Sequence, residues 1–314
     1  MMDVARPLEE LTVAGLDRDT ALTVGVFDGV HRGHLHLLNT LMSRAKARGL
    51  AAGVITLHPH PALVLDPRAE IAYLTSLEVR VRLLQESGVD FVLSLTFTPE
   101  VAHLSAAEFV AALRDQLRMR FLLVGPDFAL GRDRQGNAGS LSELGKEMGF
   151  EVEPLTPLVE DGVVVSSSAI RSALEAADID TVNRLLGRPF SLHGPIVRGV
   201  ERGRIIGFPT ANIATGSGLA LPPFGVYVTR SWIDGVARES VTNIGRRPTF
   251  DDGERTIEVH IMDFDGDLYG KEVRVDVLKR LRGEVRFDGA EALSEQIRRD
   301  VAAARQYFEA GSPA

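Results

Sequence analysis

The sequence predicts two domains, an α/β domain built on a parallel sheet and an antiparallel β-barrel closed by one helix. Length is the first observation, because 314 residues suffice for about two domains, each with its own core. The second is the alternation of strand and helix patterns from Ala21 to about Leu186, which is typical of parallel sheets with helical crossovers. The third is a change near Gly187, after which short β-branched runs are separated by glycine, proline and aspartate.

In the first half, turn and cap residues mark the ends of the expected elements. An apolar run over residues 22–26 predicts a strand, and apolar residues at three- and four-residue steps predict a following helix that Arg48-Gly49 ends. Further strands are expected over residues 51–57, 91–95, 121–124 and 163–165, and helices over residues 76–87, 105–117 and 140–148. The segment 58–61 (HPHP) is expected neither to extend the second strand nor to begin a helix.

The second half has the pattern of a β domain. Strands are expected over residues 190–198, 225–233, 239–243, 257–262 and 271–280, and an amphipathic helix over residues 294–308. An antiparallel barrel closed by this helix is the simplest arrangement. The acidic run 263–267 does not match a calcium-binding EF-hand loop, because Leu268 and Arg274 stand where glycine and glutamate are required. We therefore expect an Asp-Gly hairpin turn there.

Composition excludes several classes of protein. The net charge of −8 argues against a protein that mainly binds nucleic acid, since such proteins usually carry a basic excess. The chain has no cysteine, which excludes disulfides, thiolate zinc sites and cysteine nucleophiles. The N-terminal segment MMDVARPLEELT carries acidic residues where a signal peptide needs an apolar run, and no segment approaches 18 consecutive apolar residues. We expect a cytoplasmic protein without a membrane or nucleic-acid partner.

The stretch 24–39 (VGVFDGVHRGHLHLLN) predicts a phosphate-binding site. It joins a strand to a helix through a tight turn, and the first N–H groups of a helix attract anions. Gly25, Gly29 and Gly33 allow the backbone to approach a ligand closely. The chain contains neither of the two common phosphate-loop patterns, G-x-x-x-x-G-K-[ST] and G-x-G-x-x-G.

Two histidines extend this prediction. His31 and His34 are expected on the first helical turn, where imidazoles donate hydrogen bonds to phosphate oxygens without fixed positive charge. The alternative is two surface histidines near a helix start. The serines 166–168, taken alone, are expected to cap the helix that follows them. Because ligands of open α/β sheets bind beyond the carboxyl ends of the strands, the loops carrying Gly29, His58 and Gly125 should face one crevice.

A second candidate site lies in the β-rich half, at the segment 203–212 (GRIIGFPTAN). A glycine-rich segment with an arginine can surround phosphates, and Thr210 and Asn212 offer the neutral oxygen ligands that Mg²⁺ accepts. The alternative is an ordinary loop. Strand alternation puts Glu258 and His260 on one face, and a carboxylate in that position can act as a general base for a hydroxyl.

The string Gly25 to His34 (GVFDGVHRGH) resembles the signature of the nucleotidylyltransferase superfamily in the form used by prokaryotic FAD synthetases. This resemblance implies a Rossmann-like nucleotidylyltransferase domain over residues 1–186 that adenylylates FMN. It implies catalytic roles for His31, His34 and Arg171. The nucleotide and phosphate ligands that it implies are Gly25, Phe27, Asp28, Gly29, Gly33, Ser166, Ser167 and Ser168, and the flavin ligands are His58, Pro59, Asp127 and Phe128. The sequence departs from the family at Leu130, where an aromatic residue is more usual, and at Ser168, where threonine is usual.

The motifs PTAN at residues 209–212 and EVHIMDF at residues 258–264, with glycines at 194 and 199, resemble the riboflavin kinase domain. This second resemblance implies a kinase over residues 187–314 in which Glu258 is the base and Thr210 and Asn212 hold Mg²⁺. It also implies nucleotide ligands at Gly203, Arg204 and Gly207 and flavin ligands at Arg282, Glu284 and Phe287. Without the resemblance, the segment 282–287 would be a solvated charge run.

Together the two resemblances imply a bifunctional riboflavin kinase and FMN adenylyltransferase of the prokaryotic type. Its small-molecule partners would be ATP, riboflavin and FMN, and its cofactor Mg²⁺; the sequence leaves self-association open. Two other functions remain as alternatives. The first is a single-activity FMN adenylyltransferase whose β domain senses flavin, against which Thr210, Asn212 and Glu258 speak. The second is a non-enzymatic regulator that reports flavin levels to a partner, which no DNA-binding helix pair or basic stripe supports.

Overall fold

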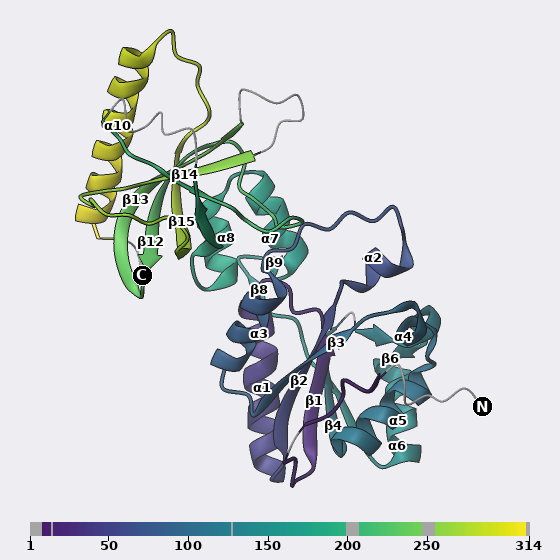
Figure 1. Cartoon of the computed structure of the whole chain (residues 1–314). Coiled ribbons are helices and arrows are strands. Elements are labelled where there is room, and N and C mark those ends of the chain that lie inside the picture. Colours follow the sequence, from purple (N-terminus) through teal and green to yellow (C-terminus); the bar gives the residue numbers. More distant parts are fainter. Residues whose placement is uncertain (1–7, 14, 127, 199–206, 247–254, 312–314) are drawn as a thin grey trace. The chain divides into compact units, whose positions relative to one another are not determined.

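The computed structural model describes residues 8–13, 15–126, 128–198, 207–246 and 255–311. The chain divides into two compact units, Met1–Ser167 and Ser168–Ala314 (Figure 1). In the described parts of both units, no helix has the length and apolar character needed to cross a membrane.

The first unit is built on a parallel sheet of five strands, as the sequence predicts. The order is β3-β2-β1-β4-β7, and every neighbouring pair is parallel. The strands are β1 (Thr20–Gly25), β2 (Ala51–His58), β3 (Phe91–Thr96), β4 (Met119–Val124) and β7 (Glu151–Pro154). The last of these was not predicted from the sequence. Since all five strands run the same way, the loops that follow them lie at one edge of the sheet.

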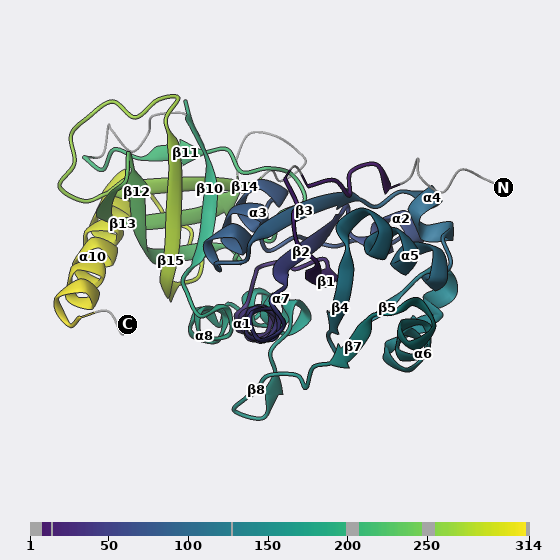
Figure 2. The same cartoon turned by 90° about the horizontal axis from the view of Figure 1, so that it is seen from below.

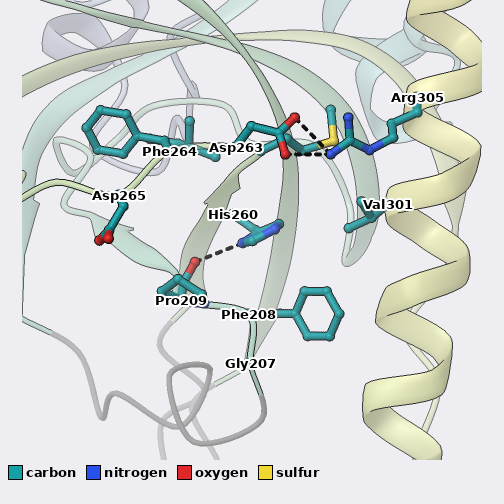
Figure 3. A pocket seen from close by; sticks show the side chains of 11 residues that line it. Gly207, Phe208, Pro209, His260, Asp263, Phe264, Asp265, Val301 and Arg305 are labelled. Atoms are coloured by element: carbon teal, nitrogen blue, oxygen red, sulfur yellow. Dashed lines mark hydrogen bonds and ion pairs between the residues drawn. The ribbon is translucent and has the colours of Figure 1, made fainter.

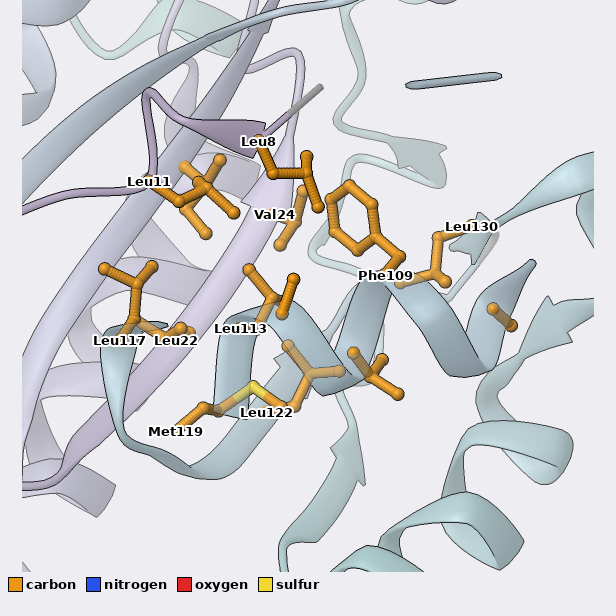
Figure 4. Close-up of a cluster of buried hydrophobic side chains, with 14 of the residues drawn as sticks. Leu8, Leu11, Leu22, Val24, Phe109, Leu113, Leu117, Met119, Leu122 and Leu130 are labelled. Atoms are coloured by element: carbon orange, nitrogen blue, oxygen red, sulfur yellow. The ribbon is translucent and has the colours of Figure 1, made fainter. Parts of the chain in front are cut away.

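Helices cover both faces of this sheet. One face carries α1 (Arg32–Arg48) and α3 (Leu77–Glu86), which pack on alternate residues of β1, β2 and β4. The other carries α5 (Ala106–Leu117) and α6 (Ala138–Met148), and Figure 4 shows side chains of α5 against those of β1 and β4. The central strands β2, β1 and β4 are largely apolar on both sides because both of their faces are buried, whereas the edge strand β7 is partly exposed.

Shorter elements complete the first unit. They are α2 (Pro61–Leu65), α4 (Pro99–His103), β5 (Ala129–Leu130), the 3₁₀ turn Arg132–Arg134, β6 (Gly136–Asn137), β8 (Val159–Glu160) and β9 (Val163–Val164). The prediction that residues 58–61 would not begin a helix is wrong, since α2 begins at Pro61. Proline is tolerated there because the first helical N–H has no intrahelical partner to lose.

The described residues of the second unit form two helices, a closed six-stranded antiparallel barrel and a long final helix (Figure 2). The barrel order is β10-β11-β14-β13-β12-β15. The elements are α7 (Ser167–Glu175), α8 (Ile179–Leu186), β10 (Phe190–Val197), β11 (Ala211–Ile213), β12 (Gly225–Ile233), β13 (Val236–Arg246), β14 (Arg255–Ile261), β15 (Glu272–Arg282) and α10 (Ala290–Glu309). This confirms the predicted barrel and its closing helix, which packs through Ala304 on outward-facing valines of β12 and β13.

One local prediction in the barrel is wrong. The acidic run 263–267 is not a hairpin turn, because β14 and β15 are not neighbours in the barrel and residues 262–271 form a longer connection between them. Asp263 instead forms an ion pair with Arg305 of α10, at 2.7 Å.

Candidate active sites

The loop between β1 and α1 has a strained backbone. Phe27 and Val30 have φ values of 55° and 38°, in the left-handed region that side chains other than glycine rarely adopt. The buried carboxylate of Asp28 accepts hydrogen bonds from the backbone N–H groups of Leu74 and Thr75, at 3.0 and 3.2 Å. Asp28, expected among the nucleotide ligands, therefore has a clear role inside the protein, where it fixes this loop to the chain before α3.

His31 caps the helix that follows. Its Nδ1 accepts a hydrogen bond from the His34 backbone N–H at 3.3 Å, and the two imidazole rings stack with centroids 3.6 Å apart. Because Nδ1 accepts, the proton of the neutral His31 ring lies on Nε2, which can donate to a ligand. The edge of Phe27 packs on His34, with 5.1 Å between ring centroids.

The segment 165–167 lies against this loop. A Cβ atom added to Gly33 would be 2.8 Å from the Val165 carbonyl oxygen, so only glycine allows the two backbones to pass this closely. The Ser167 hydroxyl donates to the Asp28 carbonyl at 2.8 Å. The structure thus brings Ser166 and Ser167 to the His31 loop, whereas Ser168 and Arg171 lie further along α7, in the second unit.

The predicted flavin ligands of the first unit lie at or after the ends of β2 and β4, the two strands that pair with β1. His58 is the last residue of β2, and Phe128 follows β4 and packs on the apolar cluster beneath α5. Burial lowers the pKa of His58 below its ordinary value, and the positive charge of Arg80 lowers this pKa further. Pro59 continues the chain from β2, Leu130 is buried in β5, and Asp127 lies outside the described residues.

In the barrel, strand pairing brings three polar side chains into one row. Asn212 of β11 is paired with Glu258 of β14, which is paired on its other side with Asn243 of β13. Side chains of directly paired residues lie on the same face with Cβ atoms about 5 Å apart. The burial of β14 alternates, so Glu258 and His260 share the half-exposed outer face, as predicted, while Val259 is buried. Nothing in the sequence pointed to Asn243, because its position depends on the strand register.

A cavity of about 420 Å³ is lined by His260, which shares a face of β14 with Glu258 (Figure 3). His260 lies in its wall, with Nδ1 2.9 Å from the Pro209 carbonyl oxygen and its ring against the edge of Phe208. The lining residues are Gly207, Phe208, Pro209, His260, Ile261, Met262, Asp263, Phe264, Asp265, Val301 and Arg305. Gly207, a predicted nucleotide ligand, lines this cavity, while Gly203 and Arg204 lie outside the described residues.

The predicted flavin segment of the barrel follows β15. The Arg282 guanidinium forms a paired hydrogen bond with the buried Asp300 carboxylate of α10, at 2.8 and 3.0 Å, and lies 5.7 Å from the Phe287 ring. Arg282 therefore fastens this segment to α10. Glu284 is exposed, and its Oε1 lies 3.2 Å from the Cβ position of Gly245, which is also 3.2 Å from the Asn243 amide nitrogen. Glu284 consequently reaches the same outer face as Glu258.

Two family models match the chain in the order that the motifs predict. The model described as FAD synthetase matches residues 14–169, and the one described as riboflavin kinase matches residues 186–308. Curated proteins called bifunctional riboflavin kinase/FMN adenylyltransferase are similar over nearly the whole length. The protein from Escherichia coli K12 is 39% identical, covering 93% of this chain and 94% of its own length. Those from Pseudomonas fluorescens and Bacillus subtilis are 42% and 35% identical, with at least 92% of each chain covered.

A crystal structure described as a macrolide-efflux protein from Streptococcus pneumoniae has the same fold. It matches with a TM-score of 0.85 and 30% identity, covering 92% of this chain and 94% of its own. The sequence matches, the two folds and the two sets of residues agree on one conclusion. The chain belongs to the family of bifunctional riboflavin kinase/FMN adenylyltransferases, enzymes that use ATP to phosphorylate riboflavin to FMN and to adenylylate FMN to FAD with release of pyrophosphate.

Proposed function

We propose that riboflavin is phosphorylated on the outer face of the barrel, with Glu258 as the general base. The observation that carries this proposal is the pairing of Asn212 with Glu258, which brings an amide and a carboxylate to one place next to Thr210. Glu258 takes the proton of the ribityl 5′-hydroxyl. The oxygen then forms a bond to the γ-phosphorus of ATP, the bond from that phosphorus to the β-phosphate oxygen breaks, and ADP leaves.

Thr210 and Asn212 are the residues that we propose for Mg²⁺. A hydroxyl and an amide oxygen fit this ion, which binds few protein oxygens and completes its shell with water and phosphate oxygens. When bound, the ion would neutralise charge on the transferred phosphoryl group. The 420 Å³ cavity has a volume usual for ligand pockets, and we propose that it takes part of the ATP molecule, because Gly207 and the aromatic ring of Phe208 line it.

We propose that FMN is adenylylated at the loop between β1 and α1. An FMN phosphate oxygen attacks the α-phosphorus of ATP, and the bond from this phosphorus to the pyrophosphate oxygen breaks. The phosphate is already an anionic nucleophile, so the site needs no base. His31 and His34 would donate hydrogen bonds to the negative charge of the transition state, and Ser166 and Ser167 would complete the anion site. Ser168 and Arg171 are proposed as further phosphate ligands on the resemblance to the family alone. The stacked rings of His31 and His34 support this assignment, because each ring restricts the other.

We further propose that the two activities divide at Gly187, with residues 1–186 making FAD and residues 187–314 making FMN. Both reactions consume ATP, which supports a cytoplasmic location. The proposed partners are small molecules only. A flavin-sensing barrel without kinase activity is the competing function, and the Asn212–Glu258 pairing speaks against it.

The experiment is one incubation of the enzyme with riboflavin, ATP and Mg²⁺, with FMN and FAD resolved by chromatography. FMN should appear first and FAD later, and EDTA should stop the formation of FMN. If added FMN became FAD while riboflavin stayed unchanged, the barrel would be a sensor. If FMN formed equally well in EDTA, the metal role of Thr210 and Asn212 would be wrong.

A further inference from the structure

A buried arginine contacts the carboxyl ends of two neighbouring strands in the first unit. Arg80 belongs to α3, and none of its side chain is exposed. Its Nη1 donates hydrogen bonds to the carbonyl oxygens of Val26, at 2.9 Å, and Leu57, at 3.2 Å. Val26 precedes the loop that carries His31, and Leu57 precedes His58. One guanidinium therefore links the two loops to which the proposed adenylylation site assigns phosphate and flavin.

This link lies where the pairing of β1 with β2 ends. The last paired residues are Gly25 of β1 and Thr56 of β2, and each is followed directly by a residue that Arg80 contacts, Val26 and Leu57. Beyond that point no strand pairing fixes the distance between the two backbones. Arg80 bridges them, and the Thr56 hydroxyl also donates to the Val26 carbonyl, at 2.9 Å. The Val26 carbonyl is thus held by two donors from two different elements.

The loop that starts at Val26 needs such support because its backbone is strained at Phe27 and Val30. Four of the contacts that hold it come from one short segment, residues 74–80. Leu74 and Thr75 donate to the Asp28 carboxylate, the Thr75 hydroxyl accepts from the Gly29 N–H at 3.2 Å, and Arg80 holds Val26. Residues 74–80, which lead into α3 and form its first turn, therefore hold this loop in place.

Burying the guanidinium of Arg80 costs free energy that packing alone would not require. Burial lowers the pKa of Arg80, and its nearest carboxylate oxygen, on Asp28, is 4.0 Å away. Among the described residues, its Nε and Nη2 have no hydrogen-bond partner. An apolar side chain of similar volume often stabilises such a position better than a charge does. An apolar side chain cannot supply the two carbonyl contacts, the ion pair with Asp28 or the contact of the guanidinium with the Tyr73 ring, whose centroid is 5.2 Å away. Of these, the two carbonyl contacts are the ones that join the two loops.

We propose that Arg80 is a positioning residue for FMN adenylylation, which sets the spacing between the phosphate loop after β1 and the flavin loop after β2 by holding Val26 and Leu57 together. The inference rests on the proposed adenylylation site, since it acts through His31, His34 and His58. It assigns no contact with substrate to Arg80. Misplacing reacting groups by about 1 Å can cost about 10²-fold in rate, which is the effect expected when the bridge is lost.

The test uses full-length enzyme with Arg80→Met, Arg80→Lys and the control Thr23→Val. Thr23 is also buried in β1, and its hydroxyl has no hydrogen-bond partner among the described residues, so its removal should leave both activities at the parent level. Arg80→Met should lower kcat for FMN adenylylation about 10²-fold, and Arg80→Lys, which keeps one donor, should recover part of it. Riboflavin kinase activity of the same chains serves as an internal control and should not change.

Two further readouts separate positioning from general destabilisation. In Arg80→Met the pKa of His58, followed by NMR, should rise, because the neighbouring positive charge is gone. If that variant does not fold, Arg80→Lys, Thr56→Val and their double variant decide the question. Both donors act on the Val26 carbonyl, so the effects on kcat should be non-additive.

Several outcomes would overturn the proposal. It is wrong if folded Arg80→Met adenylylates FMN at the parent rate while His34→Ala does not. It is also wrong if Arg80→Lys and Thr56→Val both keep the parent kcat, or if activity falls only in proportion to the unfolded fraction. If His34→Ala itself kept the parent rate, the proposed site would be wrong instead.

Discussion

His31 serves the fold and the reaction with different atoms of one ring. Nδ1 caps the N-terminus of α1 by accepting a hydrogen bond from the His34 N–H, and this hydrogen bond leaves the ring proton on Nε2, where it can be donated to a ligand. The stacked His34 ring has no such capping duty, so its replacement should affect chemistry more than folding. This makes His34 the better position for a mutation.

His34→Ala should lower FMN adenylylation about 10²- to 10³-fold, the usual effect of losing one donor to transition-state charge. His34→Asn keeps a donor of shorter reach and should retain more activity. Both variants should still phosphorylate riboflavin, so FMN should accumulate. Steady-state rates of FAD and FMN formation measure this. A folded His34→Ala enzyme that lost both activities together would contradict the donor role.

Glu258→Gln should lower FMN formation about 10²- to 10⁴-fold, because the amide cannot accept the hydroxyl proton. Added FMN should still be converted to FAD at the parent rate. His260→Gln is the comparison variant, since His260 lies on the same outer face of β14 and could act as the base in place of Glu258. If Glu258→Gln remained active and His260→Gln did not, the base would be His260.

At this scale the sequence predicted most of the candidate residues but not their supporting contacts. His31, His34, Thr210, Asn212 and Glu258 were found because they stand in short motifs. Arg80 and Asn243 were not, since their roles arise from contacts with Val26 and Glu258 that are distant in sequence. A helical arginine with no motif around it resembles any surface arginine until its burial is known.

At the scale of elements, the packing of α1 against the segment 165–167 depends on Gly33. Gly33→Ala would put a methyl group 2.8 Å from the Val165 carbonyl oxygen, a backbone atom that cannot move aside alone. The variant should destabilise the first unit by about 1 to 3 kcal/mol and slow FAD formation, because Ser166 and Ser167 shift with Val165. Chemical unfolding and FAD assays measure the two effects.

Gly49→Ala is the control for Gly33→Ala. Gly49 also has a special conformation, with a φ of 68° at the end of α1, but its Cβ position meets no atom within 4 Å. It should lose stability through backbone strain without losing FAD synthesis in the folded enzyme. Equal loss of FAD formation per folded molecule in both variants would show that the Val165 contact has no special role.

The long elements were predictable because their apolar periodicity extends over several turns or strand residues, as in α1, α5 and β12. Short elements such as β7, β11 and α2 were not predicted, since three to five residues carry too little periodicity. The prediction of a hairpin turn at residues 263–267 was wrong for another reason. A hairpin signal states which turn is easy, but the barrel order decides which strands are neighbours.

At the scale of the whole molecule, α8 belongs structurally with the barrel although it precedes Gly187. The Asn183 amide donates to the Val277 carbonyl at 2.9 Å, and its oxygen accepts from the Phe190 N–H at 2.8 Å. A protein of residues 187–314 would leave both groups without these partners, at about 1 to 3 kcal/mol each where water cannot replace them.

Residues 168–314 and 187–314 should therefore both phosphorylate riboflavin and make no FAD, but the longer protein should be the more stable. The difference in Tm should be at least about 6 °C, as expected for about 2 kcal/mol in a domain of this size. Thermal unfolding followed by circular dichroism measures it, with Asn183→Ala in the longer protein as the control for the two hydrogen bonds. A folded longer protein that bound flavin but had no kinase activity would refute the division of labour.

The most direct test of two independent sites is to mix two full-length variants. Glu258→Ala should form almost no FMN from riboflavin, and His34→Ala should stop at FMN, so neither makes much FAD alone. Mixed with riboflavin, ATP and Mg²⁺, they should form FAD together, because FMN released by one is adenylylated by the other. If each folded variant lost both activities and the mixture made neither FMN nor FAD, the assignment of one reaction to each site would be contradicted.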